Sequence, residues 1–421
     1  MGWPLGAGPF DGICPILISM SMYWHICHES SIRLWSLTSR DRFERMLIRL
    51  GIVDALRDLN DLPDGSSVLI LRGDYIFDER VLRSLSKEQN VILKMKVGRD
   101  AIPVAAHVDA VGARSVLEEM QNERLLELPN LRTVTLEDLS GSFSNELRKA
   151  DHPYVLPIRE DNRKVLEQHL FSGSYKGVTD LVTKFCWPVP AQWATRFCAS
   201  KGISPNQVTS LSLVLVILAG ISFGYGHFLL GLALGWVMTF LDTVDGKLAR
   251  VTVTSTKLGN IFDHGIDLIH PPLWYLAWGL GLVSFVPILS WLTLEITCWV
   301  ILIGYIVGRI VEGIFQWWLG GFVIFCWKTF DSYFRLITAR RNPNMILLSG
   351  SLLIGRPDLG LEAVAMWTVL STLMLLVRLG MAILEKNMKG SLTSWLAEID
   401  PVNGRDSLAV RLFTNPPVTI K

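Results

Sequence analysis

The chain has 421 residues, half of them hydrophobic, and its 40 basic and 39 acidic residues leave a formal net charge of +1. This charge balance gives no reason to propose nucleic-acid binding, and the hydrophobic share indicates an integral membrane protein with an appended soluble part. The six cysteines form no CxxC pair and are too sparse for a disulfide framework, so reduced thiols are expected.

Residues 1–175 are predicted to form a cytoplasmic α/β domain. Apolar runs rich in Val, Ile and Leu alternate with helical patterns, which gives strands at 68–71, 91–95, 102–106 and 133–136 and helices at 42–50 and 113–126. Arg72, Gly73 and Asp74 end one strand, and a helix is expected to begin near Asp78. Residues 13–26 are apolar but too short for a confident membrane span, and no basic segment typical of a signal peptide precedes them, so buried core is expected.

The segment 176–204 is predicted to contain a juxtamembrane helix. Residues 184–201 mix aromatic and basic side chains, which is typical of an amphipathic helix that lies along the cytoplasmic leaflet. A linker with incidental aromatic residues is the alternative.

The fold class expected for residues 205–386 is an α-helical polytopic domain of six transmembrane helices. The apolar runs predict spans at 206–225, 228–249, 261–284, 287–315, 343–357 and 360–384, and the fifth is short. Basic residues gather in segments 247–257 and 328–341, whereas the opposite connections carry little positive charge beyond Arg356. The positive-inside rule therefore places these two segments and both termini in the cytoplasm, across an inner membrane or its equivalent. Residues 387–421 are expected to be a poorly ordered cytoplasmic tail.

Residues 242–267 carry the strongest functional signal. Four carboxylates, on Asp242, Asp245, Asp263 and Asp267, form two pairs that would each occupy one face of a helix. Both pairs adjoin strongly apolar segments, where acidic groups are costly and usually functional. Four converging carboxylates require cations, and the hard oxygen donors favour one or two Mg²⁺ or Mn²⁺ ions. The alternative is that these aspartates are helix caps or surface charges at helix ends.

The same stretch follows the pattern D-x2-D-G-x2-A-R-x8-G-x3-D-x3-D, which resembles the signature of the CDP-alcohol phosphotransferase (CDP-alcohol phosphatidyltransferase) family. The eight matching positions are Asp242, Asp245, Gly246, Ala249, Arg250, Gly259, Asp263 and Asp267. The resemblance implies a membrane enzyme that moves a phosphoalcohol from a CDP-alcohol onto an acceptor hydroxyl, releases CMP, uses two Mg²⁺ or Mn²⁺ ions and forms a homodimer. It also implies metal ligation by the four aspartates, with Asp267 as the general base.

Several further residues are expected near the CDP group. Gly246 and Ala249 leave space for the nucleotide, Gly259 belongs to the same signature, and Arg250 offers planar donors to phosphate oxygens. Asn206 and Thr209 resemble a family element that lies near the nucleotide. A plain helix start, with Ser204 as cap and Pro205 in the first turn, explains this element equally well.

The acceptor site is expected at four arginines, Arg309, Arg335, Arg340 and Arg341. Arginines near a membrane boundary suit an acceptor that carries its own phosphate, such as inositol phosphate or glycerol phosphate. In the alternative interpretation, Arg309 pairs with Glu312 one helical turn away, and the other three are positive-inside anchors.

The N-terminal domain resembles sugar-phosphate nucleotidyltransferases, which occur fused to some members of this family that make di-inositol-phosphate phosphate. Residues 1–30, however, contain no Arg or Lys and no phosphate-binding loop, so a degenerate domain is expected. The donor would then come from elsewhere, with CDP-diacylglycerol giving a phosphatidyl product in phospholipid biosynthesis. The alternatives are a synthase that uses a CDP-polyol such as CDP-inositol, a non-catalytic membrane anchor for the N-terminal domain, and a transporter.

Overall fold

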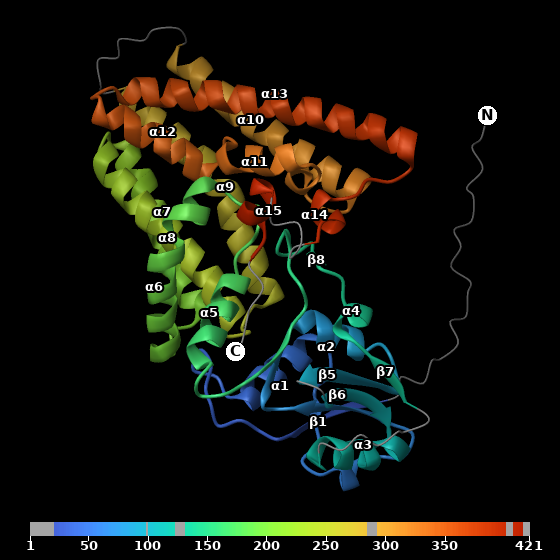
Figure 1. Cartoon of the computed structure of the whole chain (residues 1–421). Coiled ribbons are helices and arrows are strands. Elements are labelled where there is room, and N and C mark those ends of the chain that lie inside the picture. The colour runs from blue at the N-terminus through green and yellow to red at the C-terminus, as the bar shows by residue number, and fades with distance from the viewer. Residues whose placement is uncertain (1–20, 98–99, 123–130, 284–292, 401–406, 416–421) are drawn as a thin grey trace, which may run out of the picture. The chain divides into compact units, whose positions relative to one another are not determined.

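The computed structural model describes residues 21–97, 100–122, 131–283, 293–400 and 407–415 (Figure 1). The chain folds as two compact units. The first comprises Met1–Ser30, Met46–Ser140 and Tyr154–Pro157, and the second comprises Ser31–Arg45, Gly141–Pro153 and Ile158–Lys421. The predicted domain boundary at residue 175 therefore differs from this division, because several segments that precede residue 175 pack with the long helices that follow it.

The first unit is built on a mixed sheet in the strand order β2-β1-β3-β6-β5-β7. Its strands are β1 (Met22–Cys27), β2 (Asp54–Ala55), β3 (Ser67–Arg72), β5 (Val91–Val97), β6 (Asp100–Asp109) and β7 (Arg132–Val134). Strand β1 runs parallel to β2 and β3, and β6 runs antiparallel to both β3 and β5. Helix α3 (Ala110–Asn122) packs against β6, β3 and β1, while α2 (Glu79–Leu85) contacts α4 (Leu136–Leu139).

The strand predictions at 68–71, 91–95 and 102–106 are confirmed, and the reason is burial. Every residue of β3 is buried, as expected for a central strand with apolar cover on both faces. The prediction at 133–136 is correct only as far as Val134, because α4 begins at Leu136. Thr135 and Asp138 form a capping box there, which stabilises a helix start.

The segment after β3 also follows the prediction. Arg72 ends the strand and pairs with Asp74, with 2.6 Å between Nη2 and Oδ2. Strand β4 (Tyr75–Phe77) pairs with β10 (Val155–Pro157), and Asp78 then caps α2 by accepting a hydrogen bond from the Arg80 amide. Between β1 and helix α1 (Ser39–Arg49), residues 28–38 contain no glycine. A glycine-rich phosphate loop is thus missing after the first described strand.

The second unit consists mainly of long helices. They are α5 (Arg163–Gly173), α6 (Pro188–Lys201), α7 (Pro205–Gly224), α8 (Phe228–Val251), α9 (Lys257–Leu282), α10 (Leu294–Ile314), α11 (Thr329–Ile337), α12 (Arg341–Leu353) and α13 (Pro357–Lys389). Within the described residues, four helices are long and apolar enough to cross a membrane: α7, α8, α13, and α10 with its extension to Gly320. Helix α9 spans 26 residues, whereas α12 has 13 and is too short for a perpendicular crossing. The count of six spans therefore stays a prediction.

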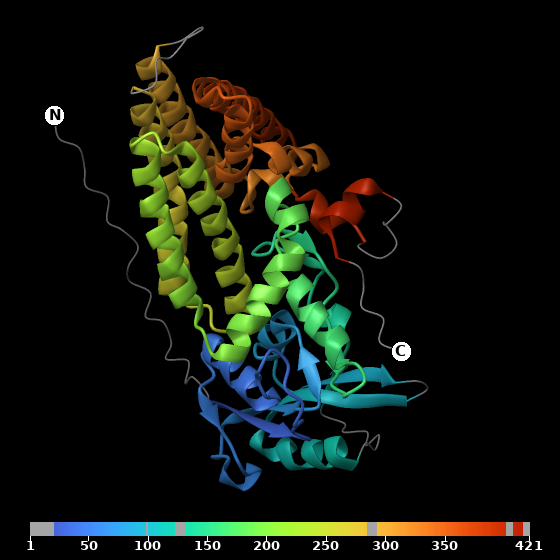
Figure 2. The same cartoon turned by 90° about the vertical axis from the view of Figure 1, so that its left-hand side faces the viewer.

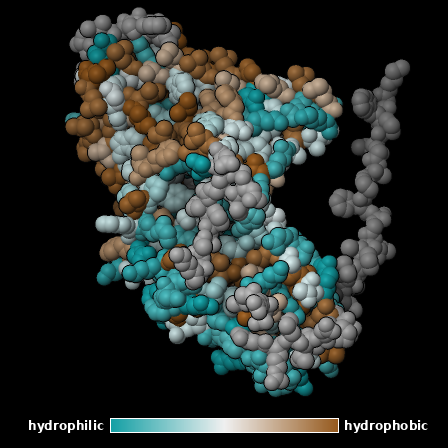
Figure 3. Space-filling view, in the orientation of Figure 1, coloured by the Kyte–Doolittle hydropathy of each residue, from teal (hydrophilic) through white to brown (hydrophobic). Residues whose placement is uncertain are grey.

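Helices α7, α8 and α9 lie side by side (Figures 1 and 2), and α10 packs along α13. Phe223 of α7 meets Trp274 and Trp278 of α9 at ring-centroid distances of 5.8 and 5.1 Å. A Cβ added at Gly281 would collide with the Phe223 carbonyl, so this glycine permits the close approach of the two helices. The outer face of these helices is rich in exposed apolar side chains (Figure 3), as expected for contact with lipid.

Helix α6 agrees with the C-terminal part of the predicted juxtamembrane helix, and a separate π-helical turn (Val182–Cys186) precedes it. Phe185, Val189, Trp193 and Phe197 are exposed and recur every four residues, so they form one apolar stripe. Ala191, Thr195 and Cys198 are buried against the rest of the unit. This stripe supports an interfacial position, which stays a prediction.

The prediction of a poorly ordered tail is wrong for the described residues beyond α13. Helices α14 (Trp395–Glu398) and α15 (Leu408–Phe413) pack into the second unit, and Leu396 and Phe413 are fully buried. Trp395 donates from Nε1 to the Ser332 hydroxyl at 2.9 Å. These buried apolar side chains anchor the segment, and the mixed charge and prolines of the sequence concealed them.

Candidate functional site

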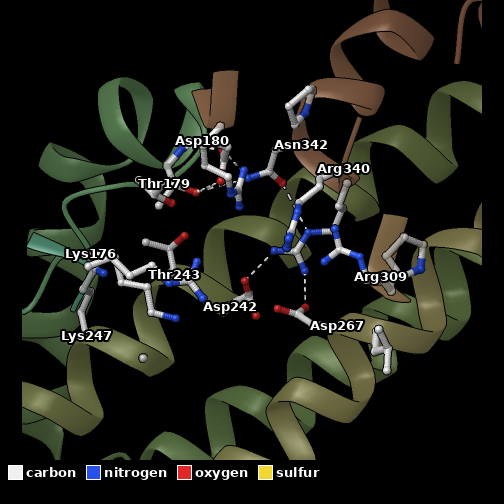
Figure 4. A pocket seen from close by; sticks show the side chains of 18 of the residues that line it. Lys176, Thr179, Asp180, Asp242, Thr243, Lys247, Asp267, Arg309, Arg340 and Asn342 are labelled. Atoms are coloured by element: carbon white, nitrogen blue, oxygen red, sulfur yellow. Dashed lines mark hydrogen bonds and ion pairs between the residues drawn. The ribbon is translucent and has the colours of Figure 1, made fainter. Parts of the chain in front are cut away.

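A polar cavity of about 290 Å³ lies within the second unit (Figure 4). Its walls come from α8, α9, α10, the start of α12 and the segment 176–183. In the close-up, Asp242 and Asp267 lie between Lys176 and Lys247 on one side and Arg309 and Arg340 on the other. Carboxylates are thus placed at the centre of a largely basic cavity.

Asp242 of α8 and Asp267 of α9 converge on one guanidinium. Arg341 donates from Nη2 to Asp242 Oδ2 and from Nη1 to Asp267 Oδ1, both at 2.6 Å. Arg341 was predicted to bind the acceptor, yet its ion pairs are with the two aspartates, and its Nε donates to Asn342 Oδ1 at 3.3 Å. One aspartate from each half of the motif thus contacts the same guanidinium.

The other two aspartates of the motif differ in position. Asp245 is buried, and its Oδ2 lies 2.7 Å from the Thr209 hydroxyl. Asp263 belongs to α9, but its side chain lies outside the described residues. Thr209, predicted to lie near the nucleotide, therefore contacts a motif aspartate directly.

The residues present fit a hard divalent cation by their chemistry. Two carboxylates of the motif already share a positively charged partner, and oxygen donors are the ligands that Mg²⁺ and Mn²⁺ prefer. Among the side chains that the structure describes, no three His, Cys, Asp or Glu groups are gathered closely enough to hold a metal. That set omits Asp263, so the predicted four-aspartate ligand set stays a prediction.

The C-terminal end of α8 forms the lysine-rich side of the cavity. Arg250 donates from Nη1 to the Gly246 carbonyl at 3.0 Å and to the Ser174 carbonyl at 3.2 Å. The buried Lys247 ammonium lies 3.7 Å from the centre of the Tyr175 ring. This side of the cavity thus combines two cations with the small Gly246, as a phosphate-binding surface requires.

The remaining residues predicted to lie near the nucleotide are placed as follows. Gly259 lies in the first turn of α9, where a Cβ would lie 3.5 Å from the Asn206 side-chain oxygen. Asn206 and Gly259 are therefore neighbours across the starts of α7 and α9. Ala249 is partly buried on α8. Asn206 also follows the capping residue Ser204, whose capping box with Gln207 confirms the helix-start interpretation of this element.

The predicted acceptor arginines all line the cavity. Arg309 and Arg340 both form ion pairs with Glu312. Arg309 therefore pairs with Glu312, as in the alternative interpretation, and also lines the cavity. Arg335 is 7% exposed, and neither Nε nor Nη1 has a hydrogen-bond partner among the described residues. Burial, assisted by the positive charge of Arg340, lowers the pKa of the Arg335 guanidinium to about 9. These buried, incompletely paired cations define an anion-binding region.

Sequence reasoning missed the cavity residues that precede α6: Arg148, Lys176, Thr179, Asp180 and Thr183. Asp180 accepts hydrogen bonds from the Thr183 amide and hydroxyl at 3.0 and 2.9 Å and from Asn342 Nδ2 at 3.0 Å. Burial favours the neutral acid, but Arg335 and these hydrogen bonds outweigh it and hold the pKa of Asp180 below its usual value. The D-x-x-T spacing of Asp180 and Thr183 was the available signal, since such pairs form local turns.

Comparison with known proteins agrees with this geometry. Residues 202–373 match the family model described as CDP-alcohol phosphatidyltransferase. The signature of α8 and α9 lies within this match, so residues 202–373, which hold most of the site, are similar to this family.

Curated relatives match over shorter stretches. Cholinephosphotransferase 1 of Danio rerio is 27% identical over 125 residues, which cover 27% of this chain and 31% of that protein. The Xenopus laevis protein of the same name is 30% identical over 136 residues, or 29% of this chain and 32% of the relative. Archaetidylinositol phosphate synthase of Pyrococcus horikoshii is 36% identical over 78 residues, or 18% of this chain and 42% of the relative. The chain thus spans about a third of the length of the two cholinephosphotransferases.

Proposed function

We propose that this protein transfers a phosphoalcohol group, with phosphatidyl as the leading candidate, from a CDP-alcohol to the hydroxyl of a polyol that carries its own phosphate. CMP is the second product. One observation carries the proposal: Asp242 and Asp267 share a cavity with the incompletely paired arginines of α10 to α12, inside a CDP-alcohol phosphatidyltransferase domain.

The donor occupies the side of the cavity formed by α8. Lys247 and Arg250 bind the diphosphate, and Gly246 leaves room for it. Asn206 and Thr209 do not line the cavity but neighbour the motif residues Gly259 and Asp245, and by the family resemblance they border the nucleotide. Asp242, Asp245, Asp263 and Asp267 would hold two Mg²⁺ or Mn²⁺ ions, which would supply positive charge to the diphosphate and to the departing CMP. These assignments extend the family resemblance to the positions of this chain.

Asp267 is the general base. Its side chain is 41% exposed, compared with 18% for Asp242, so it is the more accessible of the two to an incoming hydroxyl. It accepts the hydroxyl proton while the oxygen bonds to the phosphorus that carries the alcohol. The bond from that phosphorus to the bridging oxygen breaks, and CMP leaves with the electron pair. A positioned base of this kind contributes roughly 100- to 10,000-fold to a rate.

The arginines favour an anionic acceptor over a cationic one. Arg309, Arg335 and Arg340 face the cavity, whereas the only carboxylate paired with Arg309 and Arg340 among the described residues is Glu312. Choline is a cation, and recognition of such a group requires aromatic rings rather than guanidinium groups. The relative whose name specifies an inositol phosphate product is therefore the better guide to the acceptor than the cholinephosphotransferases.

The proposed topology places the cavity and both termini in the cytoplasm, and homodimer formation is proposed from the family resemblance. The basic segments 247–257 and 328–341 support this orientation through the positive-inside rule. The exposed Cys186 provides a test. A membrane-impermeant maleimide should label it in inverted vesicles but not in right-side-out vesicles, with Cys186→Ser as the control, and the reverse pattern would refute the orientation.

CMP release tests the reaction. The purified, detergent-solubilised protein is incubated with Mn²⁺ or Mg²⁺, CDP-diacylglycerol, and inositol, inositol phosphate, glycerol phosphate or serine. We expect metal-dependent release that a phosphorylated polyol stimulates, and a loss of at least about 100-fold in Asp267→Asn. Release with CDP-inositol alone would establish the CDP-polyol alternative. No release with any donor would leave the membrane anchor as the function.

A further inference from the structure

A hairpin outside the family-matched segment contributes one side chain to the cavity. Strands β8 (Phe143–Ser144) and β9 (Lys149–Ala150) pair antiparallel, and the connection between them ends at Arg148. Arg148 has a backbone φ of 51°, in the left-handed region that residues other than glycine rarely adopt. A non-glycine residue held in this conformation costs energy, so the surrounding structure must fix it.

The backbone contacts that fix the hairpin are visible in the second unit. The Gly177 amide donates to the Leu147 carbonyl at 2.9 Å, and the Val178 amide donates to the Arg148 carbonyl at 3.1 Å. A Cβ at Gly177 would lie 2.8 Å from the Arg148 carbonyl oxygen and would also strike the Phe413 carbonyl of α15. The packing of segment 176–178 and α15 around the turn therefore holds the backbone at Arg148 in this conformation.

The Arg148 guanidinium lines the cavity without a described partner. Within the described residues it makes no hydrogen bond and no ion pair, although burial lowers its pKa and the charges of Arg340 and Glu312 act on it. The positive charge of Arg148 contributes to lowering the pKa of Arg335. Arg335 Nε and Nη1 also lack hydrogen-bond partners among the described residues. Arg148 is half-buried at the wall of the cavity, and like charges gathered around one cavity repel one another, so such an arrangement indicates that a bound anion completes it.

We infer that Arg148 binds the phosphate group of the acceptor together with Arg335 and Arg340. This inference rests on the proposed function for the identity of the acceptor, but anion binding itself does not. Four guanidinium groups, those of Arg148, Arg309, Arg335 and Arg340, face this region, and the carboxylates that act on them are Glu312 and Asp180. A phosphate dianion balances the excess of two positive charges and offers three acceptor oxygens to the unpaired donors.

Arg148 therefore determines specificity for the acceptor rather than for the donor. The donor-side cations Lys247 and Arg250 belong to α8. The arginine and carboxylate that act most strongly on Arg148 are Arg340 and Glu312, and Arg250 acts on it less strongly. An unphosphorylated polyol has no charge to satisfy Arg148, so this residue favours phosphorylated acceptors.

A binding measurement tests the inference without turnover. Isothermal titration of the full-length detergent-solubilised protein with inorganic phosphate, in metal-free buffer, is compared with titration by inositol. Since a hydrogen bond to a charged group contributes about 1.5–3 kcal/mol, Arg148→Gln should weaken phosphate binding about 10- to 100-fold. Arg148→Lys should retain part of the affinity, because it keeps the charge but loses the planar donor pair. The exposed Arg159 of the same unit gives the matched control, and Arg159→Gln should change nothing.

Equal phosphate affinity in the wild type and in Arg148→Gln, or no phosphate binding by the wild type, would overturn the inference. Thermal unfolding of each variant shows whether a loss of phosphate affinity comes from misfolding. Arg148→Lys separates the effect of losing the positive charge from the effect of losing the planar guanidinium donors. If phosphate binding depends on Arg148 but CMP release is absent, the proposed function fails while the anion site stands. If release occurs, Arg148→Gln should raise KM for the phosphorylated acceptor and leave KM for the CDP-alcohol unchanged.

Discussion

Arg341 is the residue on which the carboxylates of α8 and α9 depend for charge balance. Its two terminal nitrogens each lie 2.6 Å from a motif aspartate, and the side chain is 14% exposed. Removing one partner of a partly buried ion pair leaves uncompensated charge and costs up to about 3–5 kcal/mol. Arg341 therefore neutralises the same oxygen atoms that a divalent cation would take.

Replacing Arg341 should make stability depend more strongly on metal. We expect Arg341→Gln to unfold at a lower temperature than the wild type in EDTA, and Mn²⁺ to raise its melting temperature by more than it raises that of the wild type. Differential scanning fluorimetry with and without Mn²⁺ measures both shifts. Arg356→Gln, which removes an arginine paired with Asp358 instead, is the control. An equal response of Arg341→Gln and the wild type to Mn²⁺ would contradict the prediction.

Lys184 provides a pH dependence of stability. Its ammonium donates to the Gly177 carbonyl at 2.9 Å and lies over the Phe413 ring, and burial lowers its pKa from 10.5 to about 8. Because the unfolded chain binds the proton more tightly, stability should rise as the pH increases from about 8 to 10.5. Lys184→Met removes the titrating group, so the stability of the wild type relative to this variant should rise over the same interval. If the unfolding free energies of the two proteins, measured by chemical denaturation, change with pH in parallel, Lys184 is not the group responsible.

Among the elements, the C-terminal helices α14 and α15 matter most for the cavity. Phe413 packs against Tyr333 and Trp395 at ring-centroid distances of 5.3 and 6.2 Å, and α15 borders the segment that holds the Arg148 hairpin. Truncating a fully buried phenylalanine to alanine costs about 3–5 kcal/mol. These short helices are therefore structural parts of the second unit.

A truncation series tests the role of these helices. Ending the chain after Lys389 removes α14 and α15 and should lower the melting temperature markedly and weaken phosphate binding. Phe413→Ala should do the same to a smaller degree. Ending the chain after Asn415 keeps every described contact and serves as the control. Unchanged stability after removal of residues 390–421 would show that α14 and α15 do not stabilise the second unit.

The elements show which features are readable from sequence. The apolar runs of α7, α8 and α13 were predictable because one local property, hydropathy over about 20 residues, decides them. The start of α7 was predictable for the same reason, because the neighbouring residues Ser204 and Gln207 form its capping box. The tail was not predictable, because burial of Leu396 and Phe413 depends on partners far away in the chain.

The site divides in the same way. Asp242 and Asp267 were recognisable from spacing within one motif, and α8 and α9 bring them together. The role of Arg148 could not be predicted from the sequence, because only contacts between segments far apart in the chain bring residue 148 close to Arg335 and Arg340. Arg341 was assigned to the acceptor because its position among other arginines gave no information on its pairing with two aspartates.

At the scale of the whole molecule, the two units are interleaved along the chain. Residues 31–45 and 141–153 belong to the helical unit, although they flank or interrupt the α/β unit in sequence. Arg42, for example, donates to the Val251 carbonyl at the end of α8 at 2.9 Å. The helical unit thus requires chain segments from outside the family-matched residues 202–373 to complete its core and its cavity.

This organisation bears on whether the chain has one reaction centre or two. Asp74, the candidate metal aspartate of the nucleotidyltransferase-like unit, forms an ion pair with Arg72, and no glycine-rich loop follows β1. Since nucleotide phosphates need backbone amides or free cations to bind, we predict that this unit does not hold CTP. We therefore expect Asp74→Asn to leave CMP release from CDP-diacylglycerol within about twofold of the wild type, whereas Asp267→Asn loses at least about 100-fold. Titration with CTP and Mg²⁺ should give no heat that depends on Asp74. A CTP-dependent release of diphosphate that Asp74→Asn abolishes would instead establish a second active site, with the α/β unit supplying a CDP-polyol to the helical one.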